Sequence, residues 1–232
     1  MEIIEAIRNR RSIRSYKSDP VPRKVLEEIL DTCRWTTSAS NTQPWEFAIL
    51  GGKKMEELKA RLVEKIKMSW DSSTLTFADI NPDVPRPEGG WPEPYLHRVL
   101  ELRGRIDSYQ FPAGTEQLDE RRAGYMLHGG RLYDAPNAII LYTESSMCPM
   151  ALFDTGAIAQ AICLAALNYG LGTCIMGMVV TWPDILRELL DIPDSALIVM
   201  GIAIGYPDNE ARVNNFVRTR EPLDTFTHWY GV

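Results

Sequence analysis

Three arginines stand within five positions near the start of the chain. Arg10, Arg11 and Arg14 belong to the run R-R-S-I-R-S-Y at residues 10–16, which we call the arginine cluster. The whole chain is acidic, with a formal net charge of −6, so a cationic cluster of this density favours a bound anion. Guanidinium groups match phosphate geometry, and serine adds a donor. The cluster predicts a site for a cofactor phosphate or polar edge, and a solvated basic turn is the open alternative.

A second polar stretch, residues 36–43, is dense in small hydrogen-bonding side chains and cannot pack a core. It lies between a predicted helix, which begins near Pro22 and ends near Trp35, and a predicted strand at 46–50. A polar loop held between two such elements is a favourable place for a ligand. The alternative is a connector whose hydroxyls cap their own backbone.

The sequence offers little support for other kinds of chemistry. It contains no C-x-x-C pair, P-loop, G-x-S-x-G or histidine pair with metal-ligand spacing, so no metal is expected. Net acidity argues against a nucleic-acid partner, and no apolar run approaches the ~20 residues of a membrane span. The acidic N-terminus does not resemble a secretory signal. We therefore expect a cytoplasmic protein whose cysteines are reduced.

The remaining elements alternate between helices and strands. Such alternation favours a layered α/β sheet with parallel pairing, in which the wholly apolar strand 196–204 is buried on both faces. The predicted helices are 2–9, 53–68, 95–106, 151–169 and one that starts at Thr181 and Pro183; the other predicted strands are 137–143 and 172–176.

Residues 69–124 look like an excursion from a single domain that spans 1–232. Five prolines between Asn81 and Pro94 forbid a regular element there, and residues 107–124 are polar and rich in turn formers. Long irregular insertions are often lids or partner-wrapping arms. The aromatic content of this one indicates a planar ligand or a subunit interface. Residues 208–232 are predicted to extend away from the core.

Several stretches together resemble the FMN-dependent nitroreductase superfamily. The arginine cluster resembles its R-R-S-x-R-x-[FY] opening, and residues 38–47, S-A-S-N-T-Q-P-W-E-F, resemble its S-x-x-N-x-Q-P-W-x-F loop. The helix and turn at 157–172, the A-I-G-Y-P run at 203–207 and the R-T-R-E-P-L run at 218–223 are similar to later family motifs. The order and spacing also match.

The resemblance implies an α+β, three-layer α/β/α fold whose sheet includes antiparallel pairing, in place of the parallel sheet. It also implies a homodimer with two FMN sites, each built from both subunits, and residues 208–232 wrapping the partner. NAD(P)H would reduce the flavin and leave before an acceptor binds, a ping-pong mechanism. Nitroaromatic, quinone or enone-like compounds would be the acceptors.

Carried onto this chain, the resemblance assigns most cofactor contacts to the two ends. Arg10 would face the phosphate and Arg14 the pyrimidine edge of the flavin, while Arg11 and Ser12 hold the cofactor through backbone and hydroxyl. No catalytic side chain is expected, because the flavin carries the chemistry. The other implied contacts are Arg218 and Arg220 over the phosphate, Ser38, Ser40, Asn41 and Gln43 reaching the other subunit's flavin, and Met176 and Gly177 beside flavin N5.

The excursion is expected to supply the acceptor site. The run W-P-E-P-Y-L-H-R at 91–98 is similar to the insertion of one nitroreductase branch, with signature Y/W-P-x-x-Y-x-x-R. The candidate substrate residues are Ser40, Trp91, Tyr95, Tyr109 and Phe111.

Other functions stay open at this point. A reductive dehalogenase of halotyrosine or halophenol type would carry E-x-x-x-Y in its lid, and residues 69–124 contain no such pattern. The branch that makes a cobalamin base is a further alternative. A flavin-binding module without turnover, or a structural dimer whose arginines pair with its acidic surface, would need no acceptor.

Overall fold

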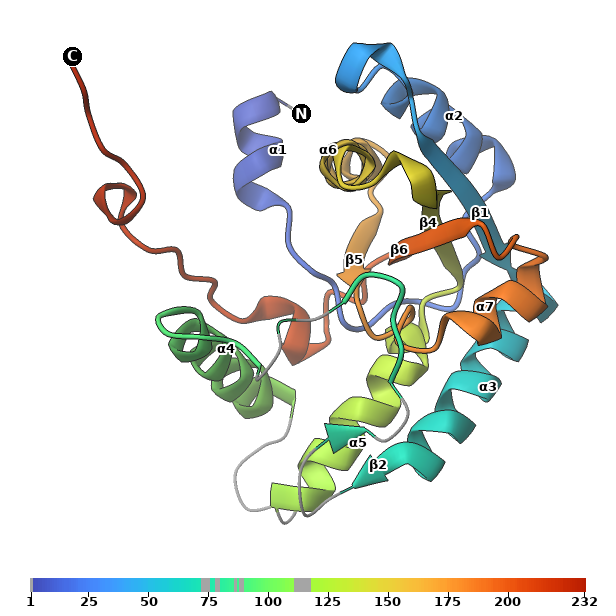
Figure 1. Ribbon diagram of the computed structural model, residues 1–232. Coiled ribbons are helices and arrows are strands. Elements are labelled where there is room, and N and C mark those ends of the chain that lie inside the picture. The colour runs from blue at the N-terminus through green and yellow to red at the C-terminus, as the bar shows by residue number, and fades with distance from the viewer. Residues whose placement is uncertain (1, 72–75, 78–79, 86, 88–89, 111–117) are drawn as a thin grey trace.

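A four-stranded sheet forms the centre of the computed structural model, which describes residues 2–71, 76–77, 80–85, 87, 90–110 and 118–232 (Figure 1). Its order is β1-β4-β6-β5, and each neighbouring pair is antiparallel. This arrangement confirms the α+β prediction and shows that the parallel pairing favoured by the alternation of elements is wrong. The strands are β1 (Trp45–Gly51), β4 (Asn137–Glu144), β5 (Gly172–Met176) and β6 (Ala196–Gly205).

Helices cover both faces of this sheet and create two cores. Successive residues of a strand point to opposite faces, so Ile139 and Leu141 of β4 pack in one core, and Ala138 and Ile140 in the other. Helices therefore bury β4 and β6 on both sides, which explains why β6 reads as a continuous apolar run. The first core contains α2 (Arg23–Cys33) and α6 (Met150–Leu167); the second contains α3 (Gly52–Ser69) and α7 (Pro183–Leu190) and is flanked by α5 (Leu118–Gly130).

Helix α5 falls partly in the stretch interpreted as polar and turn-rich, and that interpretation is wrong for residues 118–124. The helix packs against α3 and ends in two glycines. A Cβ at Gly130 would lie 2.4 Å from the Ile66 side chain, so this glycine permits close approach between the helices. Helix α4 (Tyr95–Gln110) was predicted, but it extends beyond residue 106.

Helix α6 is long and apolar enough, by length and composition alone, to cross a membrane. Eight of its residues are buried inside the protein, including Ile158, Ile162 and Cys163. It contacts α2, all four strands of the sheet and the short helix α1 (Ile3–Asn9). Packing in the first core accounts for its apolar composition. Gly170, with φ +68°, follows the helix as predicted.

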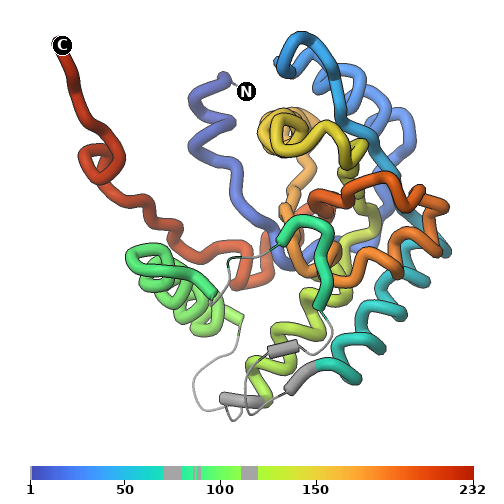
Figure 2. The backbone as a smooth tube through the Cα atoms, in the orientation of Figure 1, coloured from blue at the N-terminus to red at the C-terminus, as the bar shows by residue number. Residues whose placement is uncertain are grey.

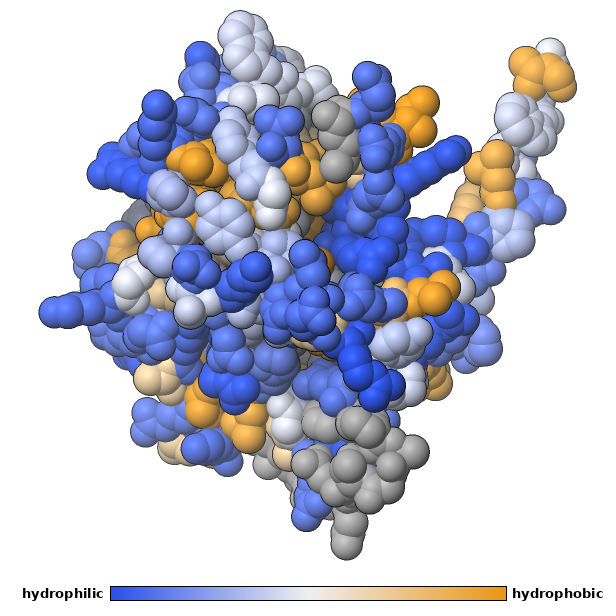
Figure 3. Space-filling view, turned by 180° about the vertical axis from the view of Figure 1, so that it is seen from behind, coloured by the Kyte–Doolittle hydropathy of each residue, from blue (hydrophilic) through white to orange (hydrophobic). Residues whose placement is uncertain are grey.

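The segment that follows α1 and the segment that follows β6 pass close to each other at one side of the sheet (Figure 2). The arginine cluster follows α1, and the return segment, residues 207–221, follows β6 and includes the short 3-10 turn η4 (Arg212–Asn215). Beyond it the chain leaves the body as an arm, residues 222–232, which includes the 3-10 turn η5 (Leu223–Thr225) and carries exposed hydrophobic side chains (Figure 3). A small hairpin, β2 (Trp70–Asp71) with β3 (Thr76–Phe77), lies after α3.

Replacing Gly172 with alanine should destabilise the fold where the sheet meets the arginine cluster. The new Cβ would lie 2.4 Å from Ile13 Cγ1 and 3.0 Å from Pro207 Cγ. Overpacking of this kind costs about 1–3 kcal/mol, which urea unfolding would measure. Gly104→Ala is the matched control, because nothing lies within 4 Å of the added methyl on α4, and alanine there should be neutral or stabilising by up to ~1 kcal/mol. Equal stability of the two variants would contradict the packing argument.

Candidate functional site

The arginine cluster lies along the edge of the sheet formed by β5. Ser12 forms a parallel bridge with Thr173, and the backbone N–H of Ile13 donates to the Thr173 carbonyl over 3.0 Å. The side chains of Ile13 and Tyr16 are buried in the second core. This backbone pairing and burial hold the cluster on a rigid element, as a binding site requires.

The return segment crosses the arginine cluster and is hydrogen-bonded to it. The Arg218 guanidinium donates to the carbonyl oxygens of Arg10 and Arg8, the latter over 2.6 Å. Arg11 Nη1 donates to the Asn214 carbonyl over 2.8 Å. These bonds join residues that are more than 200 positions apart.

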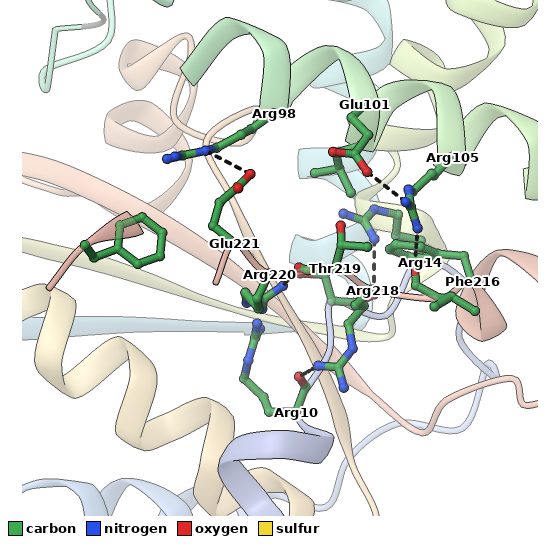
Figure 4. Close-up of a pocket in the computed structure, with 14 residues that line it drawn as sticks. Arg10, Arg14, Arg98, Glu101, Arg105, Phe216, Arg218, Thr219, Arg220 and Glu221 are labelled. Atoms are coloured by element: carbon green, nitrogen blue, oxygen red, sulfur yellow. Dashed lines mark hydrogen bonds and ion pairs between the residues drawn. The ribbon is translucent and has the colours of Figure 1, made fainter. Parts of the chain in front are cut away.

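A cavity of about 310 Å³ lies between the arginine cluster, the return segment and helix α4 (Figure 4). Six arginines and two glutamates contribute to its wall. Arg10 and Arg220, from opposite ends of the chain, both face it (Figure 4). The charged lining residues are Arg10, Arg14, Arg98, Glu101, Arg105, Arg218, Arg220 and Glu221; the others are Ser12, Leu102, Phe216, Val217, Thr219 and Phe226.

Both glutamates of the cavity are paired with arginines of α4. Arg98 Nε lies 3.3 Å from Glu221 Oε1, and Arg105 Nη2 lies 2.7 Å from Glu101 Oε1. Within the described chain, no carboxylate forms an ion pair with the other four arginines. The cavity therefore carries a surplus of about four positive charges.

The pKa of Arg218 responds both to its burial and to the neighbouring positive charges. Burial, followed by the positive charges of Arg11, Arg220 and Arg10, lowers the pKa of Arg218 below its usual value. Like charges disfavour one another's charged forms, and a nearby anion reverses the effect. The arrangement therefore favours a ligand with negative charge.

Arg14 sits deeper than the other arginines and is only 8% exposed. Its Nη1 donates to the Ser12 carbonyl over 3.3 Å, and its guanidinium lies over the Phe216 ring, 5.5 Å from the centroid. Its Nε has no hydrogen-bond partner in the described part of the protein. A buried donor without a partner is costly, so a ligand with a hydrogen-bond acceptor fits here.

These two features match the two polar parts of FMN. Unpaired guanidinium groups and the nearby Thr219 suit a phosphate dianion. The buried Arg14 beside Ser12 suits the carbonyl-rich pyrimidine edge of a flavin. The residues present therefore fit FMN.

Three candidate substrate residues of the excursion, Trp91, Tyr95 and Tyr109, do not line this cavity. Trp91 and Tyr95 are about half exposed, at 51% and 53%. Tyr109 packs edge-on against Phe216, with ring centroids 6.2 Å apart. Phe111 lies outside the described residues. The α4 residues that do line the cavity, Arg98, Glu101, Leu102 and Arg105, were missed, although their i, i+3, i+4 and i+7 spacing is the available signal.

The polar loop at 38–43 also lies away from the cavity of its own chain. Three residues that are not glycine have left-handed backbones, Ser40 (φ 50°), Asn41 (φ 57°) and Gln43 (φ 49°). Such backbones cost about 1–3 kcal/mol each and often occur at ligand sites. The loop is held by Asp154, which is 2% exposed and accepts from the Ala39 N–H over 3.2 Å.

The predicted N5 neighbours stand at the end of β5, next to the arginine cluster in the sheet. Met176 is buried in the second core, and Gly177 follows it in a bend. Neither lines the cavity. For these residues and for the loop, the roles implied by the resemblance stay predictions.

Comparison with known families decides what kind of protein carries this site. The model of the nitroreductase family matches residues 7–206. The chain belongs to the nitroreductase family. This membership confirms the predicted superfamily, and the matched range includes the arginine cluster but ends before the return segment.

Nitroreductases of known activity match over nearly the whole chain. A chloronitrobenzene nitroreductase from Comamonas testosteroni is 30% identical and covers 97% of this chain and 95% of its own. A 4-nitrobenzoate reductase from Nocardioides sp. is 31% identical, covering 97% and 88%. The FMN-dependent nitroreductase NfnB from Mycobacterium smegmatis, solved with NADPH, has a TM-score of 0.86 at 25% identity, covering 98% and 97%. The predicted class, a flavoprotein oxidoreductase, agrees with these relatives.

Replacing Arg98 with alanine should loosen helix α4 from the C-terminal segment of this nitroreductase. The Arg98 guanidinium lies 5.6 Å from the Tyr95 ring centroid and 5.4 Å from that of Phe226, and it pairs with Glu221. Loss of these contacts should raise local amide hydrogen exchange in α4 several-fold. Arg103→Ala is the matched control, since Arg103 is exposed on the same helix and does not line the cavity. Equal exchange in both variants would show that α4 is held by other contacts.

Proposed function

We propose that this nitroreductase uses FMN to transfer electrons from NAD(P)H to nitroaromatic, quinone or enone-like acceptors. The observation that carries the proposal is the meeting of Arg10 and Arg220 at one cavity whose positive charge is not compensated. The chemistry named for the relatives, reduction of chloronitrobenzene and of 4-nitrobenzoate, supports the same reaction type.

Binding of the cofactor phosphate is the task of three arginines. Arg10 and Arg220 face the cavity directly. Arg218 donates hydrogen bonds to the carbonyls of Arg8 and Arg10. It therefore holds the two segments together and contributes mainly its charge to phosphate binding. A phosphate group carries about −1.5 to −2 charge at neutral pH, which offsets much of the surplus.

Arg14 is the residue that most directly affects electron transfer. When bound, FMN supplies the hydride and electron chemistry. A fixed cation in a buried site stabilises negative charge more strongly than a solvated one. Arg14 is buried against Phe216, so its charge should favour the reduced form, in which negative charge lies at the pyrimidine edge.

The nicotinamide donor and the acceptor should use the same space in turn, which gives ping-pong kinetics. Residues 69–124 would cover that space as a lid. The exposed aromatic side chains of Trp91 and Tyr95 are available to contact an acceptor when the second subunit is present. We place the enzyme in the cytoplasm.

A homodimer would complete the site. The polar loop at 38–43 lies away from its own chain's cavity, so it would serve the cavity of the partner. The arm exposes Leu223, Phe226 and Trp229 at 59% or more, and α1 exposes Ile3 and Ile4 at 62% and 63%. Apolar side chains gathered in this way favour a protein partner, and a second copy is the partner that the family resemblance implies.

Replacing Arg220 with alanine should weaken FMN binding about 10- to 100-fold, because a charge-assisted hydrogen bond contributes about 1.5–3 kcal/mol. Binding is measured by quenching of flavin fluorescence. Riboflavin lacks the phosphate, so its affinity should change little. Arg212→Ala is the matched control, since Arg212 is an exposed arginine of the same segment and does not line the cavity.

The unaltered protein should be yellow when purified and should bleach with NADH or NADPH without oxygen. Stopped-flow of the reduced enzyme against nitroaromatics, quinones, enones and halophenols then ranks the acceptors. Preferred turnover of the halophenol would favour the dehalogenase alternative, and bleaching without turnover of any acceptor would favour a flavin-binding module. A colourless protein with no affinity for FMN would refute the proposal.

Removing residues 223–232 should weaken the dimer. The truncation deletes the exposed apolar side chains of the arm and leaves Arg218 and Arg220 in place. Sedimentation velocity over a range of concentrations should show a dimer for the full chain and a larger monomer fraction for the shortened one. A full chain that sediments as a monomer would refute the dimer.

A further inference from the structure

One buried asparagine, Asn214, connects the two arginine-bearing ends of the chain. It lies in the 3-10 turn η4 and is 4% exposed. Its Oδ1 accepts from the backbone N–H of Arg14 over 2.7 Å. Its Nδ2 donates to the carbonyls of Ser15 and Asp208, each over 2.8 Å. The side-chain amide therefore has both its donors and its acceptor engaged.

The backbone of Asn214 takes part in the same junction. Its carbonyl accepts from Arg11 Nη1 over 2.8 Å, and its N–H donates to the Ala211 carbonyl over 3.0 Å. Two residues further on, Phe216 lies against the Arg14 guanidinium. This single residue thus fixes the backbone of the arginine cluster against the turn from which the return segment continues to Arg218 and Arg220.

Electrostatics explains why such a junction is needed. The two segments carry positive charges that repel each other: burial is the first cause that lowers the pKa of Arg218, and the charges of Arg11, Arg220 and Arg10 lower it further. A neutral amide can hold both backbones without neutralising any guanidinium, so the positive charge stays available to a ligand. A carboxylate at the same place would pair with Arg11 or Arg14 and remove part of that charge.

We propose that Asn214 is a positioning residue for the cofactor site: it sets the place of Arg14 relative to Arg218 and Arg220 while lining no part of the cavity itself. This inference rests on the proposed FMN site. Asparagine suits the role because it offers two donors and an acceptor in one small planar group. Aspartate has the same shape but, when ionised, only accepts hydrogen bonds, so the carbonyls of Ser15 and Asp208 would lose their donor.

The test replaces Asn214 with aspartate and measures two properties of the folded protein other than turnover. FMN affinity, from fluorescence quenching, should fall at least tenfold. The equilibrium between bound flavin and a reference redox dye should shift about tenfold against the reduced flavin, because Arg14 is no longer held in place. Circular dichroism confirms that the variant is folded.

The neighbouring asparagine provides a matched control. Asn215 is exposed and lies in the same turn, and its Nδ2 donates to the carbonyls of Asn209 and Ala211 over 2.9 and 3.3 Å. Asn215→Asp adds the same charge one position away without touching the arginine cluster, so both measurements should stay within about twofold of the unaltered protein. Asn214→Ser, a neutral change, should show the same losses as Asn214→Asp and replaces it if that variant does not fold.

The outcomes separate this inference from the proposed function. If the unaltered protein binds FMN and folded Asn214 variants bind it equally, with an unchanged dye equilibrium, the inference is wrong and the proposed function stands. Equal losses for the Asn214 and Asn215 aspartates, with no loss for Asn214→Ser, would assign the effect to charge alone and also overturn it. If the unaltered protein does not bind FMN, the proposed function itself fails.

Discussion

Four arginine side chains from the two ends of the chain share one cavity, and their mutual repulsion would separate those ends if nothing else held them. Uncharged groups, backbone carbonyls and one side-chain amide, hold the two segments together. Arg218 donates to the carbonyls of Arg8 and Arg10, and the buried amide of Asn214 bonds to the backbone of the arginine cluster. Because no carboxylate among the described residues pairs with these four arginines, their positive charge remains available to an anion.

The sheet makes this meeting of the ends possible. Strands β5 and β6 bring Thr173 and Pro207 to the positions where they pair with the arginine cluster. Close approach there depends on glycine, since a Cβ at Gly172 would overlap Ile13, and one at Gly205 would lie 3.1 Å from Tyr16 Cδ1. Two cores, one on each face of the sheet, keep these strands in place, so the arginine cluster rests on well-packed strands.

Most helices and strands could be predicted within a few residues, because their apolar side chains recur with helical or strand spacing. Strand direction could not, since β6 is buried on both faces and carries no alternation that would distinguish antiparallel from parallel pairing. Helix α5 was missed because residues 107–124 are polar and rich in turn formers, whereas the helix is held by its packing against α3. Both errors concern features that depend on neighbouring elements rather than on the segment itself.

The types and spacing of Arg10, Ser12 and Arg14 by themselves predicted a site for a phosphate or a polar ring edge at this end of the chain, because few other groups offset such a density of guanidinium. The tertiary structure decided which other residues join them. Arg98 and Arg105 of α4 line the cavity together with their acidic partners. The Arg218 guanidinium binds backbone carbonyls. Trp91, Tyr95 and Tyr109 do not line the cavity. The physical reason is that Arg98 and Arg218 find their partners in segments about 100 to 200 positions away, which no local pattern encodes, whereas the pair of Arg105 with Glu101 is a local i, i+4 contact.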